Sequence, residues 1–188
     1  MSINLTADQS SALSAIRTFL ADESLDAFIL RGGAGTGKTT LVGKLVEVLE
    51  HMNLSRALLA PTGRAARILG NKVSEMTGRD VAATTIHSCI YVLERIEVNE
   101  TASDPNDPGI RMVFPLKEVE PTVALYIIDE SSMLGDKKAH GDYIQFGSGR
   151  ILKDIVSFCR LRRSCRDDDL VTKLLFVGDP AQLPPIGE

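Results

Sequence analysis

The stretch that decides the fold is residues 32–39, which read Gly-Gly-Ala-Gly-Thr-Gly-Lys-Thr and satisfy the pattern G-x-x-x-x-G-K-S/T in full. An apolar run, Ala27–Leu30, precedes it, and Lys38–Glu50, which follows, has apolar residues at helical spacing. The sequence therefore predicts a strand, a glycine-rich turn and a helix in that order. Such a turn points successive N–H groups at an anion, and the helix directs the positive end of its dipole at the same place. We predict a phosphate-binding loop; the alternative is a glycine-rich turn with a solvated lysine.

The loop residues are expected to hold the phosphates of a nucleotide. Lys38 should reach the β- and γ-phosphates as a point charge, and the Thr39 hydroxyl should ligate Mg²⁺. The residues of this segment predicted to bind the nucleotide are Gly33, Ala34, Gly35, Thr36, Gly37, Lys38, Thr39 and Thr40.

A second part of the site comes from Val123–Ile128, an apolar run that is followed by Asp129 and Glu130. Two adjacent carboxylates at the end of a buried strand are costly unless a cation meets them. We therefore expect Asp129 to hold Mg²⁺, directly or through water, and Glu130 to act as the general base on an attacking water. Taken alone, such a pair is more typical of a helix cap or an exposed turn. The phosphate-binding loop upstream favours the catalytic interpretation.

The remaining apolar runs indicate a parallel sheet. Residues 57–60 and 174–177 are short and apolar throughout, which is typical of strands buried on both faces. Residues 5–21 show an amphipathic helical pattern that starts near Thr6 with a capping box to Gln9. We predict an α/β fold with three layers, α/β/α, a mostly parallel sheet and a single domain over 1–188.

Residues 91–120 interrupt this pattern. Two alternating runs flank a segment rich in Pro, Gly, Asn and Asp, which predicts an inserted, protruding β-hairpin. Farther along, 142–150 is rich in glycine and predicts a loop, and 151–163 predicts a helix.

Composition excludes several classes of protein. The 188 residues are 44% hydrophobic and 24% charged, which is typical of a globular domain and not of a disordered chain. No apolar stretch is long enough to span a membrane, and the first residues lack the layout of a secretory signal. The three cysteines lack metal-site spacing, which favours a reducing compartment, so we expect a cytoplasmic protein without membrane contact. The net charge of −4 leaves nucleic acid open as a partner, since binding depends on where cations cluster.

Four further motifs follow in a fixed order. They are Ala60–Ala66 (Ala-Pro-Thr-Gly-Arg-Ala-Ala), 84–88 (Thr-Thr-Ile-His-Ser), 129–133 (Asp-Glu-Ser-Ser-Met) and 177–185 (Val-Gly-Asp-Pro-Ala-Gln-Leu-Pro-Pro). With the phosphate-binding loop, they make the sequence resemble the N-terminal RecA-like motor domain of superfamily 1B DNA helicases, of the RecD and Dda type, over nearly its whole length. The resemblance implies a RecA-like P-loop NTPase domain that binds ATP and Mg²⁺ and moves 5′ to 3′ on single-stranded DNA.

The resemblance also implies roles for individual residues. It places Gln9 on the adenine of ATP, although Gln9 equally fits a capping box with Thr6. It places Gln182 near the γ-phosphate as a catalytic residue beside Lys38 and Glu130. The residues implied to bind DNA are Pro61, Thr62, Gly63, Arg64, Thr85 and His87. The alternatives are a solvated surface charge for the arginine and a structural role for the histidine.

The resemblance implies partners beyond the chain itself. Family members continue into a second RecA-like domain, which supplies the other wall of the ATP cleft and the arginines that neutralise the transferring phosphate. We expect this domain to be absent from 1–188, and the chain alone to bind ATP weakly and hydrolyse it slowly. The 91–120 hairpin falls where the family carries a duplex-splitting pin. The competing interpretations are another P-loop enzyme, such as a small-molecule kinase, and a non-catalytic nucleotide-binding module.

Overall fold

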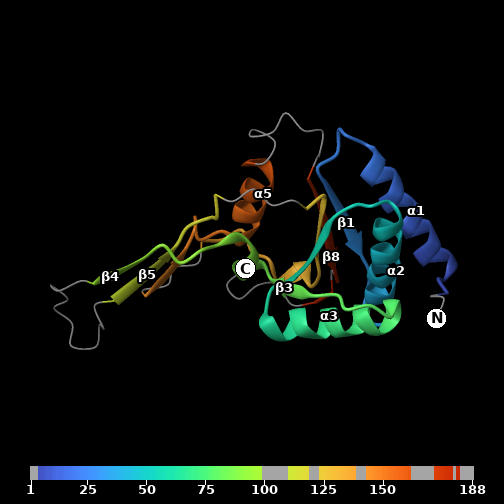
Figure 1. Cartoon of the computed structure of the whole chain (residues 1–188), viewed down its shortest axis with the longest axis horizontal. Coiled ribbons are helices and arrows are strands. Elements are labelled where there is room, and N and C mark those ends of the chain that lie inside the picture. Colours follow the sequence, from blue (N-terminus) through green and yellow to red (C-terminus); the bar gives the residue numbers. More distant parts are fainter. Residues whose placement is uncertain are drawn as a thin grey trace.

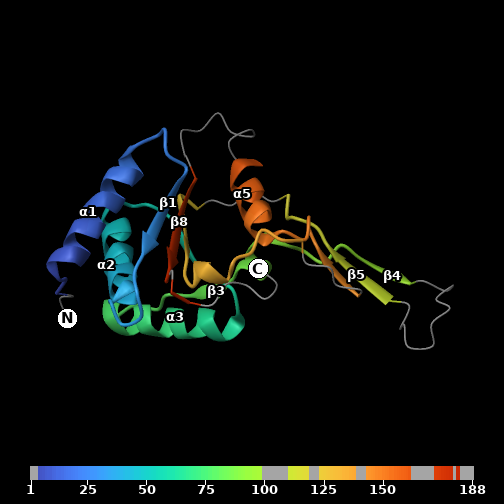
Figure 2. The ribbon, with the colours of Figure 1, turned by 180° about the vertical axis from the view of Figure 1, so that it is seen from behind.

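The computed structural model of the chain describes residues 4–98, 110–118, 123–138, 143–161, 172–179 and 181–182. Its main element is a five-stranded parallel sheet with the order β1-β8-β6-β2-β3 (Figures 1 and 2). The strands are β1 (Ala27–Arg31), β2 (Arg56–Ala60), β3 (Ala83–Thr85), β6 (Leu125–Ile128) and β8 (Lys173–Gly178). Because β8 lies between β1 and β6, the segments that follow these strands meet at one edge of the sheet.

Helices cover both faces of the sheet and make three layers. They are α1 (Ala7–Ala21), α2 (Lys38–His51), α3 (Gly63–Thr77), α4 (Ile86–Ile90) and α5 (Ile151–Leu161). Strand β6 shows the division, since Leu125 and Ile127 pack in one core with α1, α2 and α3, while Tyr126 and Ile128 pack in a second core with α4 and α5. None of the described helices has both the length and the apolar character needed to cross a membrane.

Most of the predicted elements are confirmed. The four apolar runs form strands whose ends differ from the predicted ones by at most two residues. Helix α1 begins after Thr6 with the predicted capping box to Gln9. The sequence pattern does not predict β3, because this strand has only three residues and lies at the edge of the sheet without an apolar run.

A second, three-stranded sheet projects from the body, and we call it the arm (Figures 1 and 2). It contains β4 (Arg95–Val98), β5 (Ile110–Phe114) and β7 (Ile144–Phe146) in the order β4-β5-β7. The antiparallel pairing of β4 with β5 confirms the predicted hairpin, while residues 99–109 between them lie outside the described part. The loop predicted over 142–150 is wrong for 144–146, which pair in parallel with β5. The sequence carries little strand pattern at β7, because two of the three residues of this strand are exposed.

The base of the arm is joined to the body by a buried hydrogen bond and a cluster of rings. The Tyr91 hydroxyl donates to Asp154 Oδ2 at 2.6 Å, and the Ser148 N–H donates to the same oxygen at 3.0 Å. Tyr91 and Asp154 are both buried. The ring of Phe146 lies 5.2 Å from that of Tyr91 and 4.7 Å from that of His87, measured between centroids. These contacts fix the arm to α4 and α5.

Candidate functional site

The phosphate-binding loop connects β1 to α2 and is closed on itself. Gly35 and Gly37 have φ angles of 75° and 80°, a backbone conformation that favours glycine. The Lys38 Nζ donates to the carbonyl oxygens of Gly32 and Gly33 at 2.7 and 2.9 Å. A phosphate that binds in the loop would therefore compete with two hydrogen bonds that the lysine already makes.

The loop borders a pocket of about 530 Å³. Its lining residues come from the loop, α2, α3, the end of β6 and the segment after β8. They are Ala34, Gly35, Gly37, Lys38, Thr39, Thr40, Lys72, Glu75, Met76, Asp129, Glu130 and Gln182. Every residue predicted to act in catalysis or metal binding is in this set. Of the predicted loop residues, Gly33 and Thr36 are outside it, and the Thr36 hydroxyl donates to the Gly33 carbonyl at 2.9 Å.

The pocket fits a magnesium ion. Burial raises the pKa of Asp129 above its ordinary value, while a hydrogen bond from the Glu130 backbone and the charges of Lys38 and Lys72 oppose this rise. A carboxylate that is costly to ionise gains from a nearby cation. Thr39 lines the same pocket, so hydroxyl and carboxylate oxygens, the ligands that Mg²⁺ prefers, face one space. Among the described residues, no three His, Cys, Asp or Glu side chains gather to hold a metal, so water and phosphate would supply the other ligands.

A hydrogen bond connects the segments that carry Glu130 and Gln182. Glu130 has a φ of 52°, where the chain turns into the short helix η1 (Ser131–Met133). The Ser132 hydroxyl in this helix donates to Gln182 Oε1 at 2.9 Å. This bond holds the glutamine amide beside the pocket that both residues line.

Gln9 lies against the phosphate-binding loop but outside the pocket lining. Its amide oxygen accepts a hydrogen bond from the Thr6 N–H at 3.0 Å, which completes the capping box. Its amide nitrogen donates to the carbonyl oxygens of Thr36 at 3.1 Å and Gly37 at 3.5 Å. To contact adenine, the amide would have to leave these partners, so that role stays a prediction. The contact with the loop is one that sequence reasoning missed.

The residues predicted to bind DNA meet where β2 and β3 end, because Ala60 pairs with Thr85 in the sheet. Thr62 is the N-cap of α3, and its hydroxyl accepts from the Ala65 N–H at 3.2 Å. Thr85 is the N-cap of α4, and its hydroxyl accepts from the Ser88 N–H at 3.1 Å. Both hydroxyls are thus already bound to the ends of the protein's own helices.

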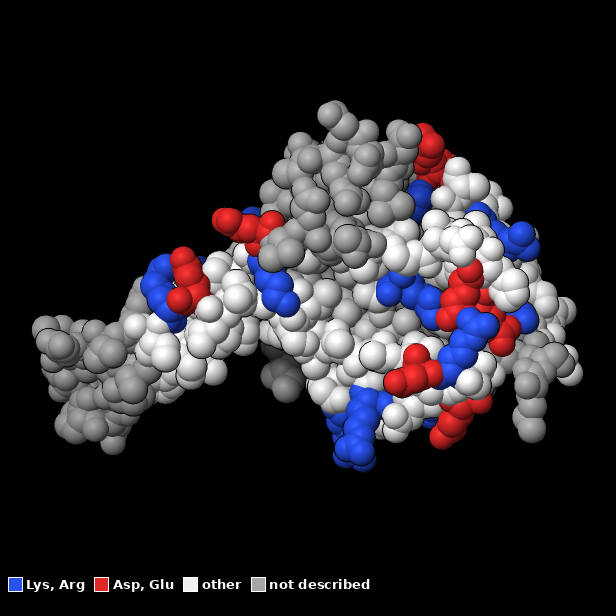
Figure 3. All heavy atoms as spheres, viewed as in Figure 1, with Lys and Arg blue, Asp and Glu red and all other residues white. Residues whose placement is uncertain are grey.

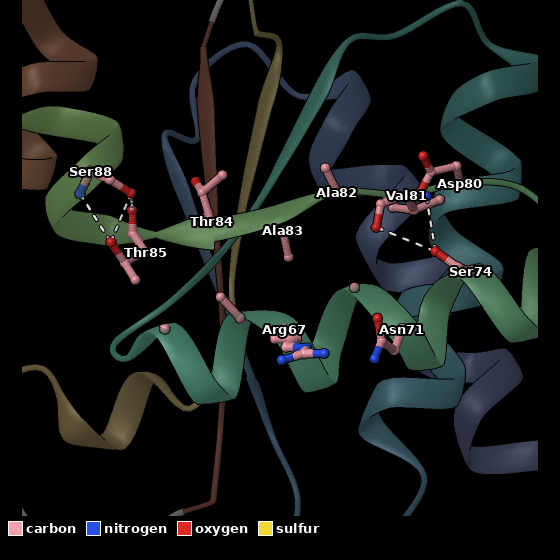
Figure 4. A pocket seen from close by; sticks show the side chains of 13 residues that line it. Arg67, Asn71, Ser74, Asp80, Val81, Ala82, Ala83, Thr84, Thr85 and Ser88 are labelled. Carbon is pink, nitrogen blue, oxygen red and sulfur yellow. Dashed lines mark hydrogen bonds between the residues drawn. The ribbon is translucent and has the colours of Figure 1, made fainter.

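A groove of about 380 Å³ runs between α3 and β3 from the first turn of α3 (Figure 4). Pro61 is half-buried before this turn, and Gly63 and Arg64 are exposed within it. Farther along, the side chains of Arg67 and Asn71 on α3 line the groove. Arg64 and Arg67 of α3 therefore lie beside the predicted DNA contacts.

His87 packs against aromatic rings. The imidazole is half-buried, and its centroid lies 4.7 Å from that of Phe146 and 5.6 Å from that of Tyr91. Burial lowers the pKa of His87, which favours the neutral ring. These contacts support the structural interpretation of this histidine, and its contact with DNA stays a prediction.

Charge on the face shown in Figure 3 is mixed, with Lys and Arg interleaved with Asp and Glu over the described residues. Part of the charge of the described residues is paired, since Glu50 forms salt bridges with Arg56 and Arg79. This face does not have the broad cationic character of a surface that binds polyanions through many phosphates. A polynucleotide bound to this face would depend on a few well-placed groups.

Comparison with known proteins identifies the family. A family model described as an AAA domain matches residues 4–141. The chain belongs to this family. The matched segment includes the phosphate-binding loop, Asp129 and Glu130, and the segments that begin α3 and α4.

Two curated relatives align with most of the chain. The ATP-dependent RecD2 DNA helicase of Deinococcus radiodurans is 30% identical over 159 residues, which is 84% of this chain and 16% of the relative. An uncharacterized protein of Methanocaldococcus jannaschii is 32% identical over 161 residues, which is 85% of this chain and 11% of the relative. The chain spans only a small part of the length of both relatives.

Among solved structures, Pif1 helicases contain a domain with the same fold as this chain. A structure of two coordinating Pif1 helicases at forked double-stranded DNA has a TM-score of 0.59 and 21% identity, and covers 98% of this chain and 36% of that one. Bacteroides Pif1 bound to single-stranded DNA has a TM-score of 0.58 and 21% identity, with coverage of 100% and 34%. At this identity the likeness shows the fold alone. The family match, the RecD2 relative and this fold confirm the resemblance to a superfamily 1B RecA-like motor domain.

Proposed function

We propose that the chain is the ATP-binding motor domain of a DNA helicase, which couples ATP hydrolysis to 5′-to-3′ movement on single-stranded DNA. The observation that carries the proposal is the single pocket shared by Lys38, Thr39, Asp129 and Glu130. A small-molecule kinase would also need the first three. A free carboxylate beside the metal ligand instead suits the activation of water. This function would place the protein with DNA in the cytoplasm.

Each polar group of the pocket would have a separate task. Lys38 would exchange the loop carbonyls for the β- and γ-phosphates. Thr39 and Asp129 would hold Mg²⁺, which neutralises phosphate charge when bound. Glu130 would take a proton from water as the water oxygen bonds to the γ-phosphorus and ADP leaves with the electrons of the broken bond. Gln182 would sense the γ-phosphate from the position that its hydrogen bond gives it.

Full activity would require a second RecA-like domain. The described residues that line the pocket include two lysines but no arginine. An arginine that enters a phosphoryl-transfer site from outside raises the rate by roughly 10³–10⁵. We therefore expect slow hydrolysis by the chain alone and rapid hydrolysis when a second domain closes over the pocket.

The polynucleotide contact would lie where β2 and β3 end. The first turn of a helix has backbone N–H groups without helical partners, and with Arg64 these suit a phosphate. Pro61, Thr85 and His87 would shape the same contact. The relative RecD2 is a DNA helicase, and the similar Bacteroides Pif1 structure is a complex with single-stranded DNA. Both support a polynucleotide as the partner.

Phosphate release from ATP tests the proposal. It should be measured for the chain and for a longer polypeptide in which a second RecA-like domain follows it, each with and without single-stranded DNA. The longer polypeptide should be faster, and the strand should stimulate it. Glu130→Gln should abolish this release while ATP binding, followed by calorimetry, is retained.

Two results would contradict the proposal. Hydrolysis that ignores the strand in the longer polypeptide would contradict the motor function. Transfer of phosphate to a small-molecule acceptor in place of water would favour the kinase. Strand binding should also weaken as salt rises, through counterion release, and binding that is independent of salt would contradict a phosphate contact.

A further inference from the structure

Helix α3 reaches the nucleotide pocket with its second half. Lys72, Glu75 and Met76 line the pocket together with Asp129. The same helix begins at Thr62, beside the proposed polynucleotide contact. None of the sequence motifs assigns a role to these three pocket residues.

Close packing of α3 on α2 fixes the place of Lys72. Its neighbours on the helix, Leu69 and Val73, are buried in the core that α2 shares. Met76 lies against Gly43 of α2, since a Cβ added at Gly43 would be 3.0 Å from the Met76 methyl carbon. A larger residue there would have to displace the Met76 side chain. Because α2 starts at the phosphate-binding loop, this packing holds the backbone of Lys72 at a set distance from the loop.

The Lys72 ammonium group is available for a ligand. The lysine is exposed, and the ion pairs found among the described residues do not include it. Its side chain nevertheless belongs to the pocket, because Lys72 lines it together with Lys38. Two lysines from different helices therefore border one space.

We propose that Lys72 is a second phosphate-binding lysine, which contacts the γ-phosphate and so distinguishes ATP from ADP. This rests on the proposed ATP site. Lys38 reaches the β- and γ-phosphates from the loop, and Lys72 lines the same pocket from α3, together with Asp129 and Glu130, where the γ-phosphate and the attacking water belong. A compact charge on a flexible stem suits a contact that forms with ATP and ends when the γ-phosphate leaves.

Calorimetric titration with Mg²⁺ and either a non-hydrolysable ATP analogue or ADP tests the proposal. Lys72→Ala should weaken binding of the analogue about tenfold, the size of one lost hydrogen bond to a charged group, and leave binding of ADP unchanged. Lys72→Arg keeps the charge and should retain most of the affinity. Arg17→Ala removes an exposed cation of α1 that does not line the pocket, and as the matched control it should change neither affinity.

The outcomes separate this proposal from the one it rests on. Equal loss for both nucleotides in Lys72→Ala, loss for neither, or the same loss in Arg17→Ala would overturn the role of Lys72. If Lys38→Ala also weakens neither nucleotide, the ATP site itself is wrong. Thermal unfolding of Lys72→Ala should match that of the unmodified chain, because the side chain is exposed and outside the salt bridges of the described residues. A large shift would show that the lysine has a structural role.

Discussion

The nucleotide pocket and the proposed DNA contact lie at two places along the same edge of the sheet, yet their polar groups are used differently. In the pocket, Thr39, Asp129 and Glu130 face a common space. At the proposed DNA contact, the hydroxyls of Thr62 and Thr85 already cap helices. The first region is arranged to receive a ligand, whereas the second uses its motif residues to fix the helix ends that would present backbone N–H groups. A motif shared with a family can therefore mark residues that support a binding site as well as residues that contact the ligand.

The largest effect is expected in the pocket. Lys38→Ala should weaken ATP binding about 100-fold, because it removes charged contacts to two phosphates, and should leave the thermal midpoint close to that of the unmodified chain. Isothermal titration with Mg²⁺·ATP measures the affinity. Lys44→Ala is the control on the same helix, since Lys44 pairs with Glu47 at 2.7 Å and does not line the pocket. An equal loss of ATP affinity in Lys38→Ala and Lys44→Ala would mean that the pocket does not bind the nucleotide through Lys38, and the contrast with the proposed DNA contact would fail.

A smaller effect, on stability, is expected at the proposed DNA contact. Thr62→Ala and Thr85→Ala should each lower the free energy of unfolding by about 1 kcal/mol, the usual cost of losing an N-cap. Urea denaturation measures this. Thr62→Ser and Thr85→Ser keep the hydroxyl and should retain the stability. If the alanine variants keep full stability and lose affinity for a single strand, the hydroxyls are ligand contacts and the contrast with the pocket fails.

The smallest effect is a dependence of stability on pH. Burial lowers the pKa of His87, so the folded state binds its proton less readily than the unfolded state does. The stability that this histidine contributes is therefore present above the unfolded pKa, about 6.5, and is lost as the pH falls through the lowered folded value. His87→Phe should flatten the unfolding free energy between about pH 7 and pH 5. An unchanged slope in that variant would mean that the ring is not desolvated as the structure has it.

Much of the fold could be predicted because its signals are local. Apolar runs marked the four longer strands of the parallel sheet, and the capping box of Thr6 with Gln9 marked the start of α1. Strands β3 and β7 were missed because three residues at a sheet edge carry too little pattern, and their pairing is set by neighbours distant in sequence. Local sequence pattern therefore predicts the fold class and the phosphate-binding loop. It does not predict which partner each side chain contacts.

In the pocket, the residues in motifs could be predicted and the others could not. Lys38 stands at the end of the glycine-rich loop pattern, and Asp129 directly follows an apolar run. Lys72 is an ordinary helix lysine in sequence, and only the packing of α3 on α2 brings it to the pocket. The contact of Gln9 with the loop was missed for the same reason, because it joins segments 27 residues apart.

The bond between Tyr91 and Asp154 bears on how the arm would respond to force. A β-sheet fastened at its base by a buried hydrogen bond and packed aromatic rings would act as a stiff lever. A duplex that pressed on its outer end would apply a torque at α4, which starts at Thr85 beside the proposed DNA path. The load would then reach the proposed DNA contact, and the base of the arm would bend little.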